Sequence, residues 1–339
     1  MNEYGSDFHA CGYPHGASTL SAAYPVYRSY ASGRVALGEL ARWRGYRRLL
    51  FPTYFCHESV RRLPGVAFYP YAPGDDINTA VRAAGAGVGD AIVVCNCWGL
   101  DTQPDYTGLT CEIIEDHTHD LISHWARSSR AHWCVASVRK TLPVPDGGIL
   151  WSPRGLALPP QPASDPDWCG IMDRRFGAMQ TKLAYLQGAS VDKAVFLNDF
   201  VYTEECFDTA ATGNWSEHTA DIVAGLDVEA WYANKRANRD VLCAALRPDS
   251  GYIIPVAAAE GATPLSLVLI FDNPERRERV RRALIARDVY PAVLWRLPEG
   301  AYDPADISGR MLSIHCDARY TPADMAAMAT TINETLALR

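Results

Sequence analysis

The sequence predicts an α/β protein with a large, mostly parallel sheet and a smaller α/β unit towards its C-terminus. Short apolar runs alternate with helical patterns between residues 32 and 151, at the spacing of β-α-β units. Two of these runs end in polar side chains, at the edge where an open α/β sheet binds its ligands. After Trp151 the pattern changes to a proline-rich stretch followed by long helical patterns.

The polar side chains at the two strand ends suggest a specific chemistry. The apolar run at 113–114 leads to two carboxylates, Glu115 and Asp116, and the run at 133–136 leads to Ser137 and Lys140. A carboxylate on one strand end and a lysine on a neighbouring one are the pair that pyridoxal phosphate (PLP) requires. The lysine forms a Schiff base with the aldehyde, and the acid keeps the pyridine nitrogen protonated.

Composition excludes several classes of protein. With 339 residues and 48% hydrophobic content the chain can build a sizeable core. A net charge of -7 argues against a nucleic-acid partner, because neutralising phosphates needs a basic face. There is no apolar run long enough to span a membrane, and the N-terminus lacks the pattern of a secretory signal. The ten cysteines are scattered without a CxxC pair, so we expect reduced thiols, no metal site and a cytoplasmic protein.

The first half of the chain carries most of the predicted sheet. Residues 1–30 are rich in aromatic residues, which favours an ordered arm lying on a domain or subunit surface. Ser32 and Gly33 precede apolar residues at helical spacing, so a helix begins there with N–H groups that favour an anion. We expect strands at residues 47–52, 66–71, 91–97, 113–116 and 133–136, and helices that open within 51–60 and at 76–84.

The second half predicts helices and a smaller sheet. The proline-rich residues 153–168 form a surface loop that is placed to cover the site. Helical spacing runs from Met172 through Thr209, and a linker at 211–219 follows. We expect helices at 228–246, 274–287 and 322–336, and strands at 265–271 and 311–314. The predicted organisation is an N-terminal arm (1–30), a large domain (31–213) and a small C-terminal domain (214–339).

Several of these segments, in this order, resemble the fold-type I PLP enzymes, in particular the DegT/DnrJ/EryC1-like aminotransferase branch. The resemblance extends from Ser32 onward and rests on the segments SGRVAL, FPTYFC, NCWG, IIEDHTH, SVRK with DGG, and SGRMLSIHCDARY. It implies a fold-type I architecture in which the large domain binds PLP. It also implies a homodimer with shared active sites and a small-molecule amino or keto substrate.

The resemblance assigns roles to residues of the two strand ends. Lys140 matches the Schiff-base lysine, Asp116 matches the acid beside the pyridine nitrogen, and His119 lies where the family has a residue near the 3-oxygen of the cofactor. Ser137 matches a phosphate-binding serine three residues before the lysine, an arrangement of related aminotransferases. DegT-like members more often have that serine five residues before the lysine, where this chain has Val135.

Other candidates are less sharply assigned by the pattern. Ser32, Gly33 and Arg34 are expected to bind the phosphate at the start of their helix. Asn96 is a second candidate for the 3-oxygen, and His117 either lies over the ring face or orients Asp116. The aromatic residue that stacks on the ring is one of three candidates: Tyr54, Phe55 and Trp98. Arg310 and Arg319 compete for the role of binding a substrate carboxylate.

The activity that the resemblance favours is an aminotransferase, in which Lys140 moves the α-proton as general acid and base. The alternative keeps PLP but breaks another bond, by elimination or replacement, epimerisation, cyclisation or C–C lyase chemistry. A third possibility is a non-catalytic relative that keeps the fold as a binding protein. A metal site built from His117, His119 and His124 has no supporting ligand spacing.

Overall fold

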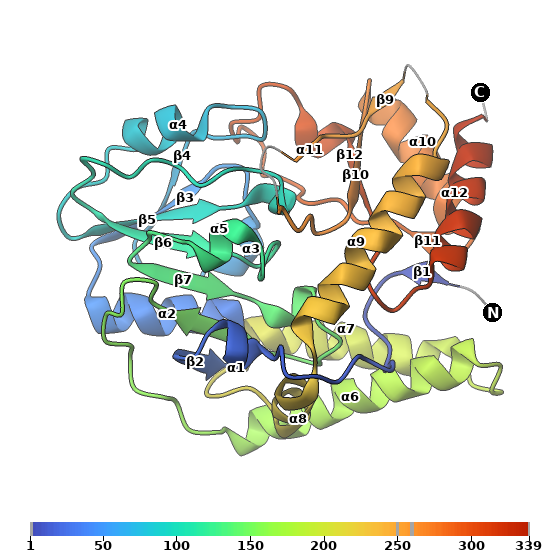
Figure 1. Cartoon of the computed structure of the whole chain (residues 1–339), viewed down its shortest axis with the longest axis horizontal. Helices are drawn as coiled ribbons and strands as arrows, with labels where there is room; N and C mark the ends of the chain where they lie inside the picture. Colours follow the sequence, from blue (N-terminus) through green and yellow to red (C-terminus); the bar gives the residue numbers. More distant parts are fainter. Residues whose placement is uncertain (1–2, 249–250, 258–260, 338–339) are drawn as a thin grey trace.

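The computed structural model describes residues 3–248, 251–257 and 261–337, and it shows an α/β architecture (Figure 1). A seven-stranded sheet has the order β2-β8-β7-β6-β5-β3-β4. From β4 to β7 neighbouring strands are parallel, whereas β8 is antiparallel to both β7 and β2. The predicted mostly parallel sheet is confirmed. Its strands are β2 (Tyr27–Tyr30), β3 (Arg48–Pro52), β4 (Val66–Tyr69), β5 (Asp90–Cys95), β6 (Glu112–Asp116), β7 (Trp133–Ala136) and β8 (Gly148–Trp151).

Hydrophobic side chains cover both faces of this sheet, because successive side chains of a strand point to opposite faces. On one face the helix α2 (Gly33–Arg44) packs against the strands through Leu37 and Leu40. On the other face Trp231 belongs to the core that covers the strands. The elements on that second side are α1 (Leu20–Ala23), α4 (Ile77–Ala83), α5 (His124–Arg127), α8 (Glu217–Gly225) and the start of α9 (Val228–Ala245).

A second unit is built around a three-stranded antiparallel sheet of order β12-β10-β9. Its strands are β9 (Tyr252–Ile253), β10 (Leu267–Phe271) and β12 (Met311–Ile314), and its helices are the C-terminal half of α9, α10 (Pro274–Ile285), α11 (Ile307–Arg310) and α12 (Pro322–Leu336). The N-terminal strand β1 (Tyr4–Gly5) pairs in parallel with β11 (Val289–Tyr290), so the arm reaches this unit. The boundaries proposed at residues 30 and 213 stay a prediction.

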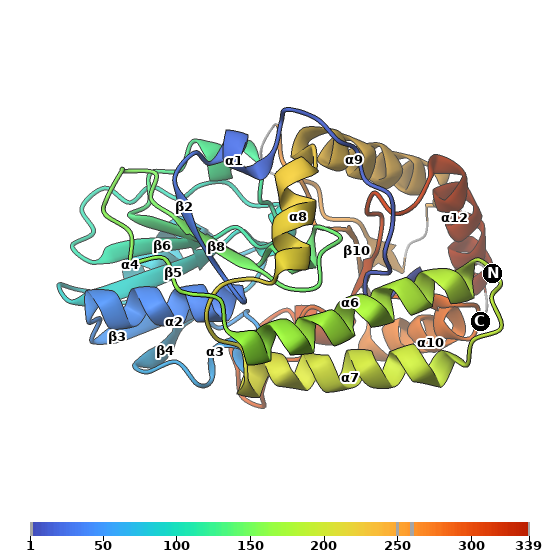
Figure 2. The ribbon, with the colours of Figure 1, turned by 90° about the horizontal axis from the view of Figure 1, so that it is seen from below.

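The helical pattern at 172–209 forms two helices. Helix α6 (Pro166–Leu186) and helix α7 (Lys193–Thr209) lie side by side as an antiparallel pair (Figure 2). The carboxylate of Asp165 accepts hydrogen bonds from the first backbone N–H groups of α6, so this helix begins earlier than the apolar spacing indicated. Between the helices Gly188 has a φ of +92°, which ends the first one.

The proline-rich loop does not cover a site. The carbonyl of Pro159 accepts a hydrogen bond from Arg28 Nε at 3.0 Å, and the amide nitrogen of Gln161 donates to the carbonyl of Ser29 at 2.9 Å. The loop therefore runs along β2, where it protects the edge of the large sheet. The prediction that this loop covers the site was wrong. An irregular, proline-rich segment is equally typical of a loop that protects an edge strand, so the composition did not distinguish the two positions.

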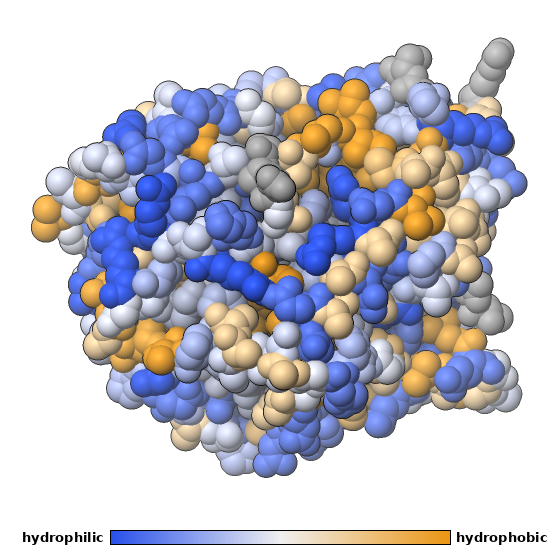
Figure 3. Space-filling view, viewed as in Figure 1, coloured by the Kyte–Doolittle hydropathy of each residue, from blue (hydrophilic) through white to orange (hydrophobic). Residues whose placement is uncertain are grey.

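Two further expectations concern the whole chain. All ten cysteines are free thiols, as the scattered spacing predicted. Within the described ranges, no helix combines the length and the apolar character needed to cross a membrane. Hydrophilic side chains cover most of the face in Figure 3, and hydrophobic ones gather near β9, where Ile253 and Val256 are exposed.

Candidate active site

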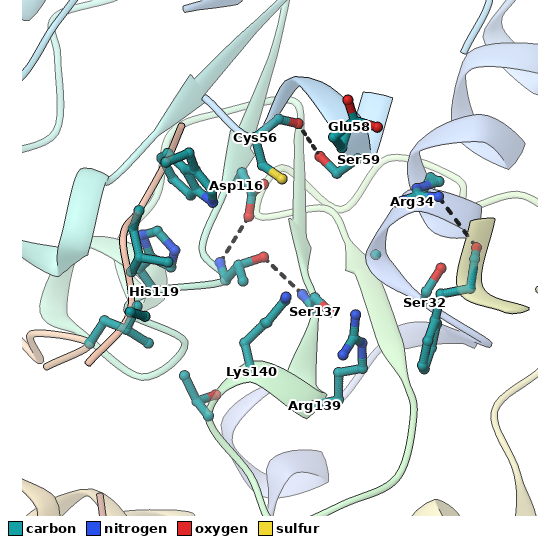
Figure 4. A pocket seen from close by; sticks show the side chains of 18 of the residues that line it. Ser32, Arg34, Cys56, Glu58, Ser59, Asp116, His119, Ser137, Arg139 and Lys140 are labelled. Atoms are coloured by element: carbon teal, nitrogen blue, oxygen red, sulfur yellow. Dashed lines mark hydrogen bonds between the residues drawn. The ribbon is translucent and has the colours of Figure 1, made fainter. Parts of the chain in front are cut away.

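A cavity of about 730 Å³ lies where the carboxyl ends of β5, β6 and β7 meet the start of α2, helix α7 and the second unit. This is the edge at which an open α/β sheet binds its ligands. Figure 4 shows the side chains that project into it. Its wall includes eight of the residues singled out by the sequence: Ser32, Gly33, Arg34, Phe55, Asp116, His119, Ser137 and Lys140.

The start of α2 forms one end of the cavity. The hydroxyl of Ser32 accepts a hydrogen bond from the backbone N–H of Val35 at 3.2 Å, so the helix begins at Gly33 as the sequence predicted. A β-carbon on Gly33 would lie only 3.2 Å from the β-carbon of Ser137, which shows how closely the helix approaches the end of β7. Because the first N–H groups of a helix lack intrahelical partners, this end of the cavity favours an anion.

A glycine on β8 permits this close approach, and substituting it is the first test of the arrangement. A β-carbon on Gly148 would lie 2.3 Å from the backbone nitrogen of Gly33, so α2 would have to move. We expect Gly148→Ala to lower the free energy of unfolding by about 1–3 kcal/mol, as overpacking does. The measurement is urea unfolding of the cofactor-free protein.

The matched control is Gly170→Ala in α6, where an added β-carbon meets no atom within 4 Å. This change is expected to stabilise the protein by about 0.5–1 kcal/mol, because alanine loses less conformational freedom than glycine in a helix. Equal unfolding free energies for the two variants would show that α2 is not held against β8.

Lys140 lies on a 3-10 turn, η2 (Val138–Lys140), which follows β7, and its side chain projects into the cavity (Figure 4). Among the described residues its Nζ has no hydrogen-bond partner. The pKa of this amine is lowered, first by the neighbouring positive charge of Arg139 and then by burial. With the charge of Arg139 beside it, the amine of Lys140 has an increased tendency to lose its proton, which is the property of a lysine nucleophile.

Arg139 is itself held by an ion pair from α7. Its guanidinium donates two hydrogen bonds to the carboxylate of Glu204, at 2.8 and 3.1 Å, and lies 3.9 Å from the centre of the Phe207 ring. Although burial raises the pKa of Glu204, the charges of Arg139 and Lys140 lower it to about 2. The pair fixes a positive charge beside Lys140 at neutral pH.

Asp116 ends β6 and is only 8% exposed. Its Oδ1 accepts a hydrogen bond from the backbone N–H of Thr118 at 2.9 Å, and the hydroxyl of Thr118 accepts one from the N–H of Ser137 at 2.9 Å. Burial raises the pKa of Asp116, while the hydrogen bonds from Thr118 lower it. The two bonds tie the ends of β6 and β7 together, so that the acid and Lys140 face the same space.

His119 forms the wall next to Asp116. Its ring stacks on Trp295 with centroids 5.2 Å apart, and its Nδ1 accepts a hydrogen bond from the backbone N–H of Trp98 at 3.0 Å. Burial lowers the pKa of His119 to about 3, so the imidazole is neutral. Because Nδ1 is an acceptor, Nε2 carries the proton and is the atom that can donate to a ligand oxygen.

Six of the predicted site residues do not line the cavity. Three of them, Tyr54, Trp98 and Asn96, are buried near the carboxyl ends of the strands. Tyr54 is 1% exposed and its hydroxyl donates to the carbonyl of Leu294 at 2.7 Å. Trp98 is 2% exposed, and its indole N–H donates to the same carbonyl at 3.4 Å. The amide of Asn96 donates to Asp120 at 2.6 Å. These groups are engaged within the protein, which leaves Phe55 as the candidate that reaches the cavity.

His117 points away from the cavity. It follows Asp116, and adjacent residues at a strand end face opposite sides. Its ring nitrogens lie 2.9 Å from Glu115 Oε2 and 2.9 Å from Asp120 Oδ1. Burial opposes its charge, but these carboxylates raise its pKa well above the usual value. His117 is therefore part of a buried ionic network behind the site and does not line the cavity, which contradicts a place over the ring face. The alternative role, orienting Asp116, stays a prediction.

The two arginines proposed for a substrate carboxylate are also elsewhere. Arg319 is buried, with its guanidinium bound to the carboxylate of Asp317 at 2.8 and 2.9 Å and to the carbonyl of Asp7 at 3.0 Å. Arg310 ends α11 and is not among the residues of the cavity wall. The arm, whose position could not be read from sequence, thus contributes the carbonyl that completes the binding of Arg319.

Several wall residues were not singled out from the sequence. Arg139 had a signal, since it adjoins Lys140. The other residues had no such signal in the sequence. A charged residue on an amphipathic helix is normally at the surface, and an aromatic residue in an irregular segment is normally in the core. These residues are Glu204 on α7, Lys235 on α9, Trp295, and His315 after β12.

Comparisons with known proteins give a match at the level of structure. No family model and no curated protein sequence matches this chain. A Streptococcus pneumoniae protein that is described as a sugar aminotransferase, solved in a PMP form, superposes with a TM-score of 0.60 over 96% of this chain and 93% of its own, at 10% identity. The aminotransferase TlmJ from Streptoalloteichus hindustanus gives 0.61 over 96% and 92%, at 15% identity.

A third solved structure extends the comparison to a differently described enzyme. The 3-amino-5-hydroxybenzoic acid synthase superposes with a TM-score of 0.63 over 94% of this chain and 89% of its own, at 14% identity. These likenesses cover nearly all of each chain, so they include the large sheet, the helical pair and the C-terminal unit. The chain therefore has the fold-type I architecture of the PLP-dependent aminotransferases.

Proposed function

We propose that this protein is a PLP-dependent aminotransferase acting on a small amino or keto substrate. The observation that carries the proposal is that Lys140 and Asp116 project into one cavity whose far end is the start of α2. A lysine amine, a buried carboxylate and an anion-binding helix start are the three groups that PLP requires. When bound, the cofactor supplies an electron sink that stabilises negative charge at the α-carbon of a substrate.

Each wall residue then has a role that follows from its position. The first turn of α2 and Ser137 hold the phosphate, and Asp116 keeps the ring nitrogen protonated through a charge-assisted hydrogen bond. The Nε2 proton of His119 is available to the 3-oxygen, and Phe55 supplies the aromatic surface beside the ring. Lys140 binds the aldehyde and afterwards carries the proton between the α-carbon and the cofactor.

The proposal extends to the amino acceptor and to the assembly. The structural neighbours described as sugar aminotransferases, and the DesI structure with its TDP-sugar product, support a sugar as the amino acceptor. We also propose a homodimer with shared active sites, in which a second subunit covers the open side of the cavity near the exposed Val201 of α7. The ten free thiols support a reducing compartment such as the cytoplasm.

The decisive experiment is reductive trapping. The protein is loaded with PLP, reduced with borohydride and digested, and the modified peptide is identified by mass spectrometry. The sequence contains only four lysines, at 140, 182, 193 and 235, so the assignment is unambiguous. We expect modification at Lys140. Modification at another lysine, or none, would contradict the proposal.

The reaction class is tested in the same preparation. On incubation with an amino acid, an aminotransferase accumulates pyridoxamine phosphate and releases the keto acid. Elimination, epimerisation, cyclisation and C–C lyase chemistry return the cofactor to its lysine-bound form. Accumulation of the pyridoxamine form is the expected result, and its absence with every amino donor tested would favour one of these alternatives.

The pKa of Lys140 gives a further prediction. Because the charge of Arg139 is the largest cause that lowers this pKa, Arg139→Gln is expected to raise it. Capture of the aldehyde needs the unprotonated amine, so the pH midpoint of PLP capture should move upwards. The measurement is the rate of PLP capture across a series of pH values.

The control for this prediction is Arg174→Gln, which removes an arginine paired with Asp199 between α6 and α7 and outside the cavity. It is expected to leave the pH midpoint of capture where it is in the unchanged protein. The same midpoint for Arg139→Gln would show that Arg139 does not set the protonation of Lys140.

A further inference from the structure

Two of the four lysines of the chain line the cavity, Lys140 and Lys235. Lys235 lies on α9 and enters the cavity wall from the side of the C-terminal unit. The residue is only 3% exposed, and within the described part of the chain its Nζ has no hydrogen-bond partner. Its nearest aromatic contact is the ring of Tyr232, whose centre is 5.1 Å from Nζ. Burying an ammonium group without a partner costs free energy, unless a bound anion pairs with its charge.

The other basic side chains near this part of the wall are already paired. Arg34 binds the carboxylate of Asp208, and Arg139 binds that of Glu204 at 2.8 Å. Arg319 binds Asp317 at 2.8 Å. Among the described residues, Lys235 is therefore the cavity cation, besides the cofactor lysine, whose charge is not matched by an ion pair.

The wall on the side of the C-terminal unit also contains hydroxyl and imidazole groups, together with Asp317, whose carboxylate is paired with Arg319. The hydroxyls of Ser266 and Ser313 are 2.6 Å apart and both line the cavity. His315 follows β12, and burial lowers its pKa to about 4, so its imidazole is neutral. One unpaired positive charge, in a wall with hydroxyl and imidazole groups and with Asp317 already matched by Arg319, fits a singly charged carboxylate. A phosphate would need more positive charge than this wall offers.

Lys140, His119 and Lys235 all line the same cavity. The charges of both lysines contribute to lowering the pKa of His119. A ligand whose amino group lies at Lys140 can thus extend along the His119 side of the cavity towards Lys235. An α-amino acid carries both groups, an amine for Lys140 and a carboxylate for Lys235.

We propose that Lys235, with Ser266, Ser313 and His315, binds the α-carboxylate of the amino-acid substrate. The inference rests on the proposed function and specifies its amino donor as an α-amino acid. It replaces Arg310 and Arg319 in this role. Lys235 has four rotatable side-chain bonds, so its ammonium can meet a carboxylate that enters the cavity.

The test compares two ligands that differ only in this group, L-glutamate and its α-amide, L-isoglutamine. Dissociation constants are measured by spectral titration of the PLP-loaded protein, for the unchanged chain and for Lys235→Met. Loss of a charged hydrogen bond is expected to weaken glutamate binding by about 10–100-fold. Isoglutamine binding should stay within about threefold, because no carboxylate meets Lys235.

A second readout does not use the cofactor. Burial lowers the pKa of Lys235 to about 8, which means that the folded protein holds this charge less well than water does. At neutral pH Lys235→Met should therefore raise the melting temperature of the cofactor-free protein. A residue that serves only the structure would show the opposite change. Lys235→Gln, which keeps a polar end without the charge, is the second variant.

The control is Lys193→Met, which removes a lysine paired with Glu3 outside the cavity. It should change neither dissociation constant. If PLP is trapped at Lys140 but Lys235→Met binds glutamate normally, or loses both ligands equally, the carboxylate assignment is overturned and the proposed function stands. If PLP is trapped at Lys235 or not at all, both are overturned.

Discussion

Lys140→Ala is expected to abolish the covalent capture of PLP and to lower turnover by at least about 10³-fold. Among the described residues of the cavity wall, Lys140 and Lys235 are the two lysines, and only Lys140 follows β7 beside Asp116. The amine has two functions in the proposed reaction, since it binds the aldehyde and carries the α-proton. Its removal therefore affects both cofactor retention and the chemical step. The measurements are borohydride trapping, the absorption band of lysine-bound PLP, and turnover with an amino donor.

The fold should survive this change, because Nζ of Lys140 makes no hydrogen bond to the described residues that would be lost. A melting temperature close to that of the unchanged protein is the control for folding. Added small amines should restore part of the proton transfer in Lys140→Ala, since the space left by the side chain opens onto the cavity. Retention of the lysine-bound absorption band in this variant would refute the assignment.

Asp116→Asn is expected to weaken PLP binding by about 10–100-fold, because the charge-assisted hydrogen bond to the ring nitrogen becomes a neutral one. Turnover should fall further than binding, since an unprotonated ring withdraws fewer electrons from the α-carbon. The hydrogen bond from the N–H of Thr118 can persist, because an asparagine oxygen accepts it equally well. The measurements are PLP dissociation constants and turnover at saturating PLP.

The stability of the cofactor-free form provides the control. Burial raises the pKa of Asp116, so the contribution of this group to stability falls as pH rises through the folded pKa. At neutral pH the buried carboxylate is therefore unfavourable, and Asp116→Asn should be at least as stable as the unchanged protein. Lower stability together with unchanged PLP affinity would assign Asp116 a structural role.

Local patterns predicted the elements that carry the site. The apolar run before Asp116 and the run before Lys140 are strands β6 and β7, and Ser32 caps α2 as its position indicated. The strand at 311–314 and the helix at 322–336 have the predicted bounds. These features depend on residues that are close in sequence, such as a capping side chain or an apolar run, so the sequence contains the information.

Contacts between distant segments decided the rest. His117 and His119 have similar sequence surroundings, yet one lies in an ionic network behind the sheet and the other stacks on Trp295. Arg319 was a candidate for binding a substrate carboxylate, but in the structure its guanidinium already binds the carboxylate of Asp317 and the carbonyl of Asp7 in the arm.

Lys235 gives the clearest case. A lysine on an amphipathic helix is normally expected at the surface. Only the packing of α9 between the two units places Lys235 in the cavity wall. The sequence by itself thus determined the strands, the helix start and the residues at their ends. The tertiary structure alone decided which charges are paired and which face the cavity, because pairing depends on side chains from elements far apart in the chain.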